Sequence, residues 1–141
     1  MDRIDRAAAL ARWPLAAAYL VAGVLHVLRP APFLAITPRW VPWPETVILL
    51  TGLCEAAGAV GLMLPRTRRL AGTMLALYAL CVYPANLHHA LAHVPVGGAT
   101  LGWWYHGPRL AAQPFIIWWA LFAGGVVRWP FRRAAGIRGG G

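Results

Sequence analysis

An acidic residue, Glu55, stands near the middle of a long apolar run, and it constrains the fold more than any other residue. From Glu45 to Leu64 the chain reads ETVILLTGLCEAAGAVGLML. A run of about 20 predominantly apolar residues is long enough to cross a bilayer as a helix. A carboxyl group at that depth costs several kcal/mol, so it normally faces a bundle interior or a water-filled cavity and has a polar partner. The sequence therefore predicts a polar site inside a membrane protein, with Glu55 at its centre.

Three more apolar runs of similar length accompany this one. The four runs cover Leu10–Leu28, Glu45–Leu64, Leu70–Leu91 and Arg109–Val127. Hydrophobic residues make up 60% of the 141 residues and charged residues only 12%, whereas about a quarter of the residues in a soluble domain are charged. Most of the surface must therefore face lipid. Because alternating strand patterns are absent from the sequence, the runs predict an all-α fold, an integral membrane four-helix bundle.

The basic residues indicate an orientation in the membrane. All 13 are arginines; Arg3, Arg6 and Arg12 lie before or at the start of the first run, three lie between the second and third runs, and four follow the fourth, so ten lie on one side. Cytoplasmic loops of membrane proteins carry an excess of basic residues, and we therefore expect both termini in the cytoplasm. A basic stripe interleaved with stacking aromatics is absent from the sequence, so no nucleic-acid partner is expected despite the net charge of +9.

The connections between the runs are too short to separate folded units, and they predict a single membrane domain over residues 1–141. The first connection, Arg29–Pro44, contains five prolines, which forbid a continuous helix. We expect this segment to cap the outer end of the bundle. The second connection, PRTRR, predicts a tight turn between antiparallel helices. The Arg/Gly-rich tail over residues 132–141 is expected to be flexible.

Polar residues within the runs gather in the half of the membrane away from the arginine-rich side. Each run supplies at least one of them, and the predicted ligand-binding cluster comprises His26, Glu55, Asn86, His89 and Gln113. Because successive helices run in opposite directions, these positions fall at similar depths and can converge on one cavity. A structural role is the alternative, since an interhelical hydrogen bond in a membrane is worth about 1 kcal/mol without any ligand.

Other kinds of site have less support in the sequence. His26, Glu55 and His89 are ligand types that zinc or iron accepts, but no paired ligand spacing lies on the helix with the acid, so no metal site is expected. Cys54 and Cys81 form no CxxC motif, and we expect buried, inert thiols, although a disulfide between them stays open. No cofactor motif is evident, and no residue can be assigned as catalytic.

Three segments carry a resemblance to a known family. AGVLHVLRPAPFLAITPRWVPWP, TGLCEAAGAVGLMLPRTRRLAG and VYPANLHHAL resemble the DoxX-like family of small bacterial membrane proteins, over about residues 20–93. The resemblance implies a multi-pass four-helix bundle in the bacterial inner membrane, with His26, Glu55, Pro84 and Asn86 at family-typical positions. The family includes the membrane subunit of thiosulfate:quinone oxidoreductase and a methylamine-utilisation maturation protein. It therefore implies a redox- or quinone-associated role, with a quinone as the candidate cofactor.

Three classes of function stay open on these grounds. The leading hypothesis is a protein that binds a small lipophilic or quinone-like ligand in the outer-leaflet polar cavity; whether it catalyses a reaction is undetermined. The second is a non-enzymatic scaffold or assembly subunit of a membrane complex. A small transporter is disfavoured, because no inverted repeat is visible. The expected partners are membrane lipids, together with a redox partner protein or a second copy of the chain as a homo-oligomer.

Overall fold

The computed structural model describes residues 3–93, 95 and 98–130. Its elements are the helices α1 (Arg3–Leu28), α2 (Ala31–Ile36), α3 (Pro44–Met63), α4 (Arg68–Leu91) and α5 (Trp103–Ala123). No extended strand occurs among the described residues, and the predicted all-α class is confirmed. Three helices, α1, α3 and α4, are long and apolar enough to cross a membrane. α5 is not among them, since polar residues such as Arg109 and Gln113 lower its mean hydropathy.

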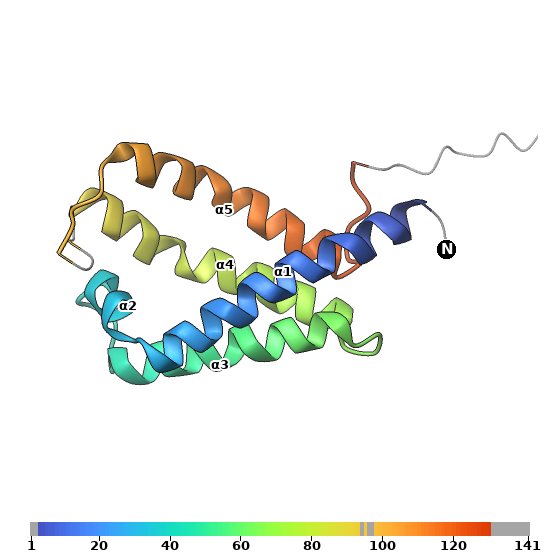
Figure 1. Ribbon diagram of the computed structural model, residues 1–141, viewed down its shortest axis with the longest axis horizontal. Helices are drawn as coiled ribbons and strands as arrows, with labels where there is room; N and C mark the ends of the chain where they lie inside the picture. The colour runs from blue at the N-terminus through green and yellow to red at the C-terminus, as the bar shows by residue number, and fades with distance from the viewer. Residues whose placement is uncertain (1–2, 94, 96–97, 131–141) are drawn as a thin grey trace, which may run out of the picture.

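The four long helices lie alongside one another, and the short helix α2 lies across one end of them (Figure 1). α1 packs most closely on α3, and α4 packs most closely on α5. Contacts between α3 and α4 and between α1 and α5 join these two pairs, so α3 and α5 are diagonal to each other. We call the end that carries α2 the α2 end. The N-terminus and the turn between α3 and α4 lie at the opposite end (Figure 1).

Two glycines bring α1 and α3 together. A Cβ atom on Gly23 would lie 2.6 Å from the carbonyl oxygen of Gly52, and a Cβ atom on Gly52 would lie 2.8 Å from the carbonyl oxygen of Gly23. Neither distance admits a side chain, so the two backbones touch only because both residues are glycine. A second close approach joins Gly72 of α4 to Gly124, where a Cβ atom on Gly72 would lie 2.8 Å from the Gly124 Cα atom.

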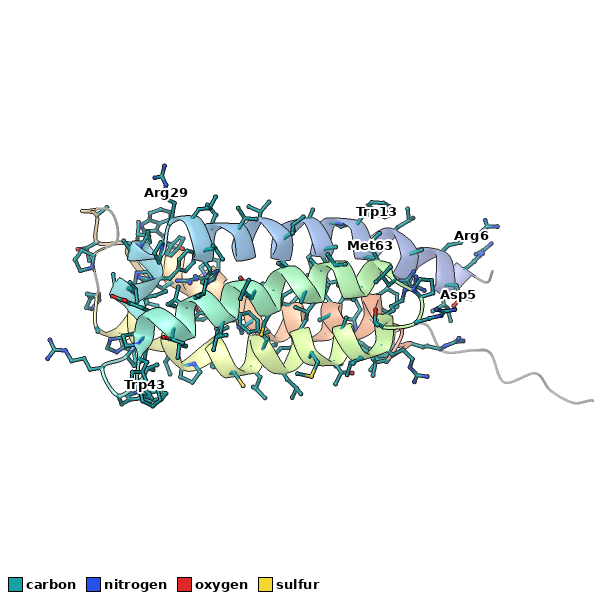
Figure 2. The ribbon with its side chains drawn as sticks, turned by 90° about the horizontal axis from the view of Figure 1, so that it is seen from below. Asp5, Arg6, Trp13, Arg29, Trp43 and Met63 are labelled. Carbon is teal, nitrogen blue, oxygen red and sulfur yellow. The ribbon has the colours of Figure 1, made fainter. Side chains whose placement is uncertain are left out.

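Many large apolar side chains on the long helices point outward. Leu20 of α1, Leu50 of α3 and Leu80 of α4 are each about half exposed. Figure 2 shows side chains projecting along the length of the helices, with Arg29 and Trp43 at the α2 end and Asp5 and Arg6 at the opposite end. The interior holds mainly alanine, with larger residues such as Leu62 and Leu75. Soluble monomers rarely expose apolar surface this extensively, and the pattern agrees with membrane-crossing helices.

α3 and α4 lie within two residues of the predicted ranges, and the other two long helices differ by more. α1 begins at Arg3 rather than Leu10, because the alanine-rich segment before the apolar run favours helix and Asp5 lies in the first turn, where an acid is stabilising. α5 covers Trp103–Ala123 rather than Arg109–Val127. It ends earlier because Gly125 adopts a left-handed φ of 71°. Apolar runs measure hydrophobic length, which is not the same as helix length. The predicted flexible tail, 132–141, lies outside the described residues.

The first connection contains α2, which starts directly after Pro30 and has proline in its first turn, where the missing amide hydrogen is tolerated. The prediction of buried cysteines is wrong. Cys54 and Cys81 are both free, and both are exposed on the outside of their helices. Adjacent residues of a helix point about 100° apart, so Cys54 turns away from the interior when its neighbour Glu55 points into it.

Candidate functional site

A cavity of about 510 Å³ lies between the long helices in the half of the molecule that carries α2. Side chains from all five helices line it, most of them apolar. The cavity reaches the outer surface, since exposed residues such as Ala18 of α1 and Cys81 of α4 belong to its wall. Its volume lies within the range of small-molecule sites, about 300 to 1,000 Å³, and its apolar lining with a few polar groups is typical of them.

Glu55 and His26 meet on one wall of this cavity. His26 Nδ1 lies 2.9 Å from Glu55 Oε2, with Glu55 4% and His26 9% exposed. The same nitrogen lies 2.8 Å from the backbone carbonyl oxygen of Ala22, one turn earlier in α1. Two oxygen neighbours favour a hydrogen on Nδ1, but a single hydrogen cannot point well at both. When this hydrogen points at the Ala22 carbonyl oxygen, Glu55 Oε2 is buried beside the imidazole without a well-directed hydrogen bond.

The backbone and α2 together fix this pair. Gly23 and Gly52, whose backbones touch, each lie one helical turn before His26 and Glu55. The close crossing of α1 and α3 therefore sets the separation of the imidazole from the carboxyl group. From α2, the Phe33 ring stacks on the His26 ring, with centroids 3.7 Å apart and planes 22° apart. Without the short helix, the outward side of the imidazole would lose this cover.

Asn86 and Gln113 meet on the facing side of the cavity and connect α4 to α5. Asn86 Nδ2 donates to Gln113 Oε1 at 3.2 Å, and Gln113 Nε2 donates to the backbone carbonyl of Ala79. Both side chains line the cavity, and Gln113 is buried. Pro84 lies between Ala79 and Asn86 and has no amide hydrogen, so the carbonyl that loses its usual helical donor is that of Leu80, four residues earlier. The bond from Gln113 goes to the neighbouring Ala79 carbonyl and therefore joins the two helices without replacing the bond that the proline removes.

His89 lies behind the cavity wall and not on it. It is 2% exposed, and its Nδ1 atom lies 2.9 Å from an Nη atom of Arg109, which does line the cavity. Arginine has no acceptor, so the guanidinium donates and His89 Nδ1 accepts. The guanidinium also lies over the ring of Tyr105, 5.7 Å from its centroid. Four of the five predicted residues thus line one cavity, and the fifth supports a residue that does.

Sequence reasoning missed Arg109, which was assigned only to the outer boundary of the fourth run. Its spacing of four residues from Gln113 was the available signal, because such positions share a helix face. Sequence reasoning also missed two other residues of the cavity wall, Tyr78, whose hydroxyl interacts with Glu55 and Thr51, and Thr51 itself. A tyrosine in an apolar run looks like an ordinary packing residue. Among the described residues, no three His, Cys, Asp or Glu side chains are grouped closely enough to hold a metal ion.

Comparison with known proteins gives a family without a described activity. No curated protein and no solved structure shows significant similarity to the chain. A family model described as a domain of unknown function (DUF8561) matches residues 15–124. That range contains every residue that lines the cavity, from Leu15 to Trp119. Since it also covers most of the 141 residues, the chain belongs to the DUF8561 family.

Proposed function

We propose that α1, α3, α4 and α5 cross the bacterial inner membrane as a DoxX-like four-helix bundle with both termini in the cytoplasm. Three of these helices are long and apolar enough to span. α5 has 21 residues, which at 1.5 Å each gives about 30 Å, the thickness of a hydrocarbon core. It packs along α4, so it shares the depth of a spanning helix. The excess of arginines at the end opposite α2 supports the orientation.

We further propose that the cavity binds a small lipophilic, quinone-like molecule with its polar end toward Glu55. The observation that carries this proposal is the Glu55 Oε2 atom, buried in the cavity wall beside His26 without a well-directed hydrogen bond. Buried polar atoms are normally satisfied, and exceptions in a pocket are candidates for ligand contact. Glu55 would exchange a proton or a hydrogen bond with the ligand, while His26 and Asn86 orient it.

A redox association rests on the resemblance of residues 20–93 to the DoxX-like family. Carboxyl, imidazole and carboxamide groups are suited to binding the oxygen atoms of a quinone ring and to moving its protons. Electrons would have to come from a partner protein or from the quinone itself. A dithiol relay is not part of this proposal, because Cys54 and Cys81 are free and point outward.

The test compares Glu55→Gln with Glu45→Gln, since both acids lie on α3 but Glu45 is exposed at its first turn. Each protein is purified in a mild non-ionic detergent, and binding of decyl-ubiquinone is followed by quenching of tryptophan fluorescence. We expect wild type and Glu45→Gln to bind alike and Glu55→Gln to bind at least about tenfold more weakly, a loss of about 1.4 kcal/mol. Thermal unfolding should hardly change. Equal binding by Glu55→Gln would refute the assignment.

A second candidate is a non-enzymatic scaffold that holds a membrane partner. The observation in its favour is a group of tryptophans at the α2 end, since Trp40, Trp43 and Trp104 are 74%, 79% and 75% exposed. Such rings suit either the lipid headgroup region or a protein interface. The two candidates differ in their response to mutation. In a scaffold, Glu55→Gln and His26→Ala should lower the unfolding temperature whether or not a lipophilic ligand is present.

A further inference from the structure

We infer that the ligand of this cavity is an anionic amphiphile, with a carboxylate or phosphate headgroup bound by Arg109. This inference rests on the proposed ligand-binding role of the cavity and, within the class of small lipophilic molecules, favours an acid bound at Arg109 over a neutral quinone bound at Glu55. Two side chains of the charged types, Glu55 and Arg109, line the cavity. They come from α3 and α5, which are diagonal in the helix arrangement. The carboxyl group has His26 as an ionisable neighbour 2.9 Å away, whereas no acidic side chain among the described residues forms an ion pair with the guanidinium.

The guanidinium of Arg109 makes two contacts, and neither is with a negative charge. It donates a hydrogen bond to His89 Nδ1, and it lies over the ring of Tyr105 in a cation–π contact. The ion pairs found among residues 3–93, 95 and 98–130 join His26 to Glu55 and Arg128 to Asp5, so no carboxylate neutralises Arg109 there. A half-buried guanidinium beside an apolar cavity attracts an anion, because the surroundings screen its charge poorly.

The guanidinium is also held in place for such a ligand. His89 is buried and accepts a hydrogen bond from one Nη atom, which uses one of five N–H donors; in the part of the chain that the structure describes, the other four donate to no protein acceptor. Carboxylate and phosphate groups accept paired hydrogen bonds from arginine, and these charge-assisted bonds are stronger than neutral ones. Gln113 follows one turn later on the same face of α5 and also lines the cavity.

The rest of the cavity suits an apolar chain. Beyond Gln113, α5 lines the cavity with Ile116 and Trp119, and α1 adds Leu15. Ten residues separate Arg109 from Trp119, which corresponds to about 15 Å along the helix axis. A ligand with its acid at Arg109 would therefore lay its chain toward the middle of the helix bundle.

The experiment uses three probes with the same chain: dodecanoate, dodecyl phosphate and methyl dodecanoate. Binding to the full-length protein in non-ionic detergent at pH 8 is measured by equilibrium dialysis. We expect at least one of the two anions to bind tenfold or more tightly than the ester, and their order to identify carboxylate or phosphate as the preferred headgroup. Arg109→Gln should abolish the preference over the ester, whose own affinity should change less than twofold. Arg39→Gln is the matched control, because Arg39 is exposed and does not line the cavity.

A cavity-filling variant separates this inference from the proposed function. Ala85→Phe would occupy a half-buried position on the cavity wall, whereas Ala57→Phe adds the same ring at an exposed position away from it. If Ala85→Phe abolishes binding of every probe but Arg109→Gln keeps the preference for anions, the ligand-class inference is overturned and the cavity stands. If Ala85→Phe changes nothing, the proposed function fails.

A second variant covers the case in which Arg109→Gln does not fold. Wild type and Arg109→Lys must then both bind the anions more tightly than the ester, and equal binding of acid and ester by wild type overturns the inference.

Discussion

Gly23 of α1 and Gly52 of α3 touch backbone to backbone, one helical turn before the residues that form the His26–Glu55 pair. The contact explains why an imidazole and a carboxyl group on separate helices lie within 2.9 Å of each other. Larger residues at either position would push the two helices apart by the width of a side chain. The polar pair therefore depends on two residues that carry no functional group.

Gly52→Ala tests this dependence. Its Cβ atom would lie 2.8 Å from both the Gly23 carbonyl oxygen and the His26 Cβ atom, so one of the helices must shift. We expect the free energy of unfolding to fall by about 1 to 3 kcal/mol, as in other overpacked cores, and the affinity for the cavity ligand to fall with it. Unfolding in mixed micelles by a denaturing detergent, followed by circular dichroism, measures the change.

The matched control is Gly107→Ala in α5, where an added Cβ atom meets nothing within 4 Å. Alanine is the better helix former, so this variant should be neutral or up to about 1 kcal/mol more stable. A Gly52→Ala protein as stable as Gly107→Ala would show that the crossing can widen without cost.

The two cysteines offer a test of the cavity that needs no new polar residue. Both thiols are exposed, but only Cys81 belongs to the cavity wall. In the single-cysteine proteins Cys54→Ser and Cys81→Ser, we expect N-ethylmaleimide to modify the remaining thiol in either case. A saturating lipophilic ligand should slow the reaction of Cys81 severalfold and leave Cys54 unchanged, as followed by intact-mass spectrometry. Equal protection of both thiols would indicate a general effect of the ligand on the micelle.

Much of this arrangement could be predicted from hydrophobic periodicity and from where polar residues interrupt it. The apolar runs predicted the long helices, since hydrocarbon thickness sets a minimum length that is easy to read. Glu55, His26, Asn86 and Gln113 were found because polar groups inside apolar helices need partners, and the structure places all four on one cavity.

The errors have equally physical causes. Helix ends depend on local propensity and on glycine conformation. Hydropathy therefore predicted neither the extension of α1 back to Arg3 nor the end of α5 before Gly125. The outward direction of Cys54 follows from helix phase, which can be fixed only after the inward direction of Glu55 is known. Arg109 was assigned to the membrane boundary because an arginine there usually marks orientation. Its contact with His89 depends on how α4 and α5 pack, and no short-range pattern contains that information.

Gln113→Leu separates structural hydrogen bonding from ligand binding on the α4–α5 side. Gln113 is buried and makes two hydrogen bonds, one from Asn86 and one to the Ala79 carbonyl, and leucine removes both. Interhelical hydrogen bonds in membranes contribute about 0.6 to 1.7 kcal/mol each, and we expect a loss of about 1 to 3 kcal/mol in the free energy of unfolding. That loss should be the same with and without ligand.

Thr73→Ala is the control, because the Thr73 hydroxyl is exposed and donates only to the Arg69 carbonyl of its own helix. Its effect should stay within about 0.5 kcal/mol. If Gln113→Leu keeps full stability and loses only ligand affinity, the amide belongs to the binding site rather than to the helix interface.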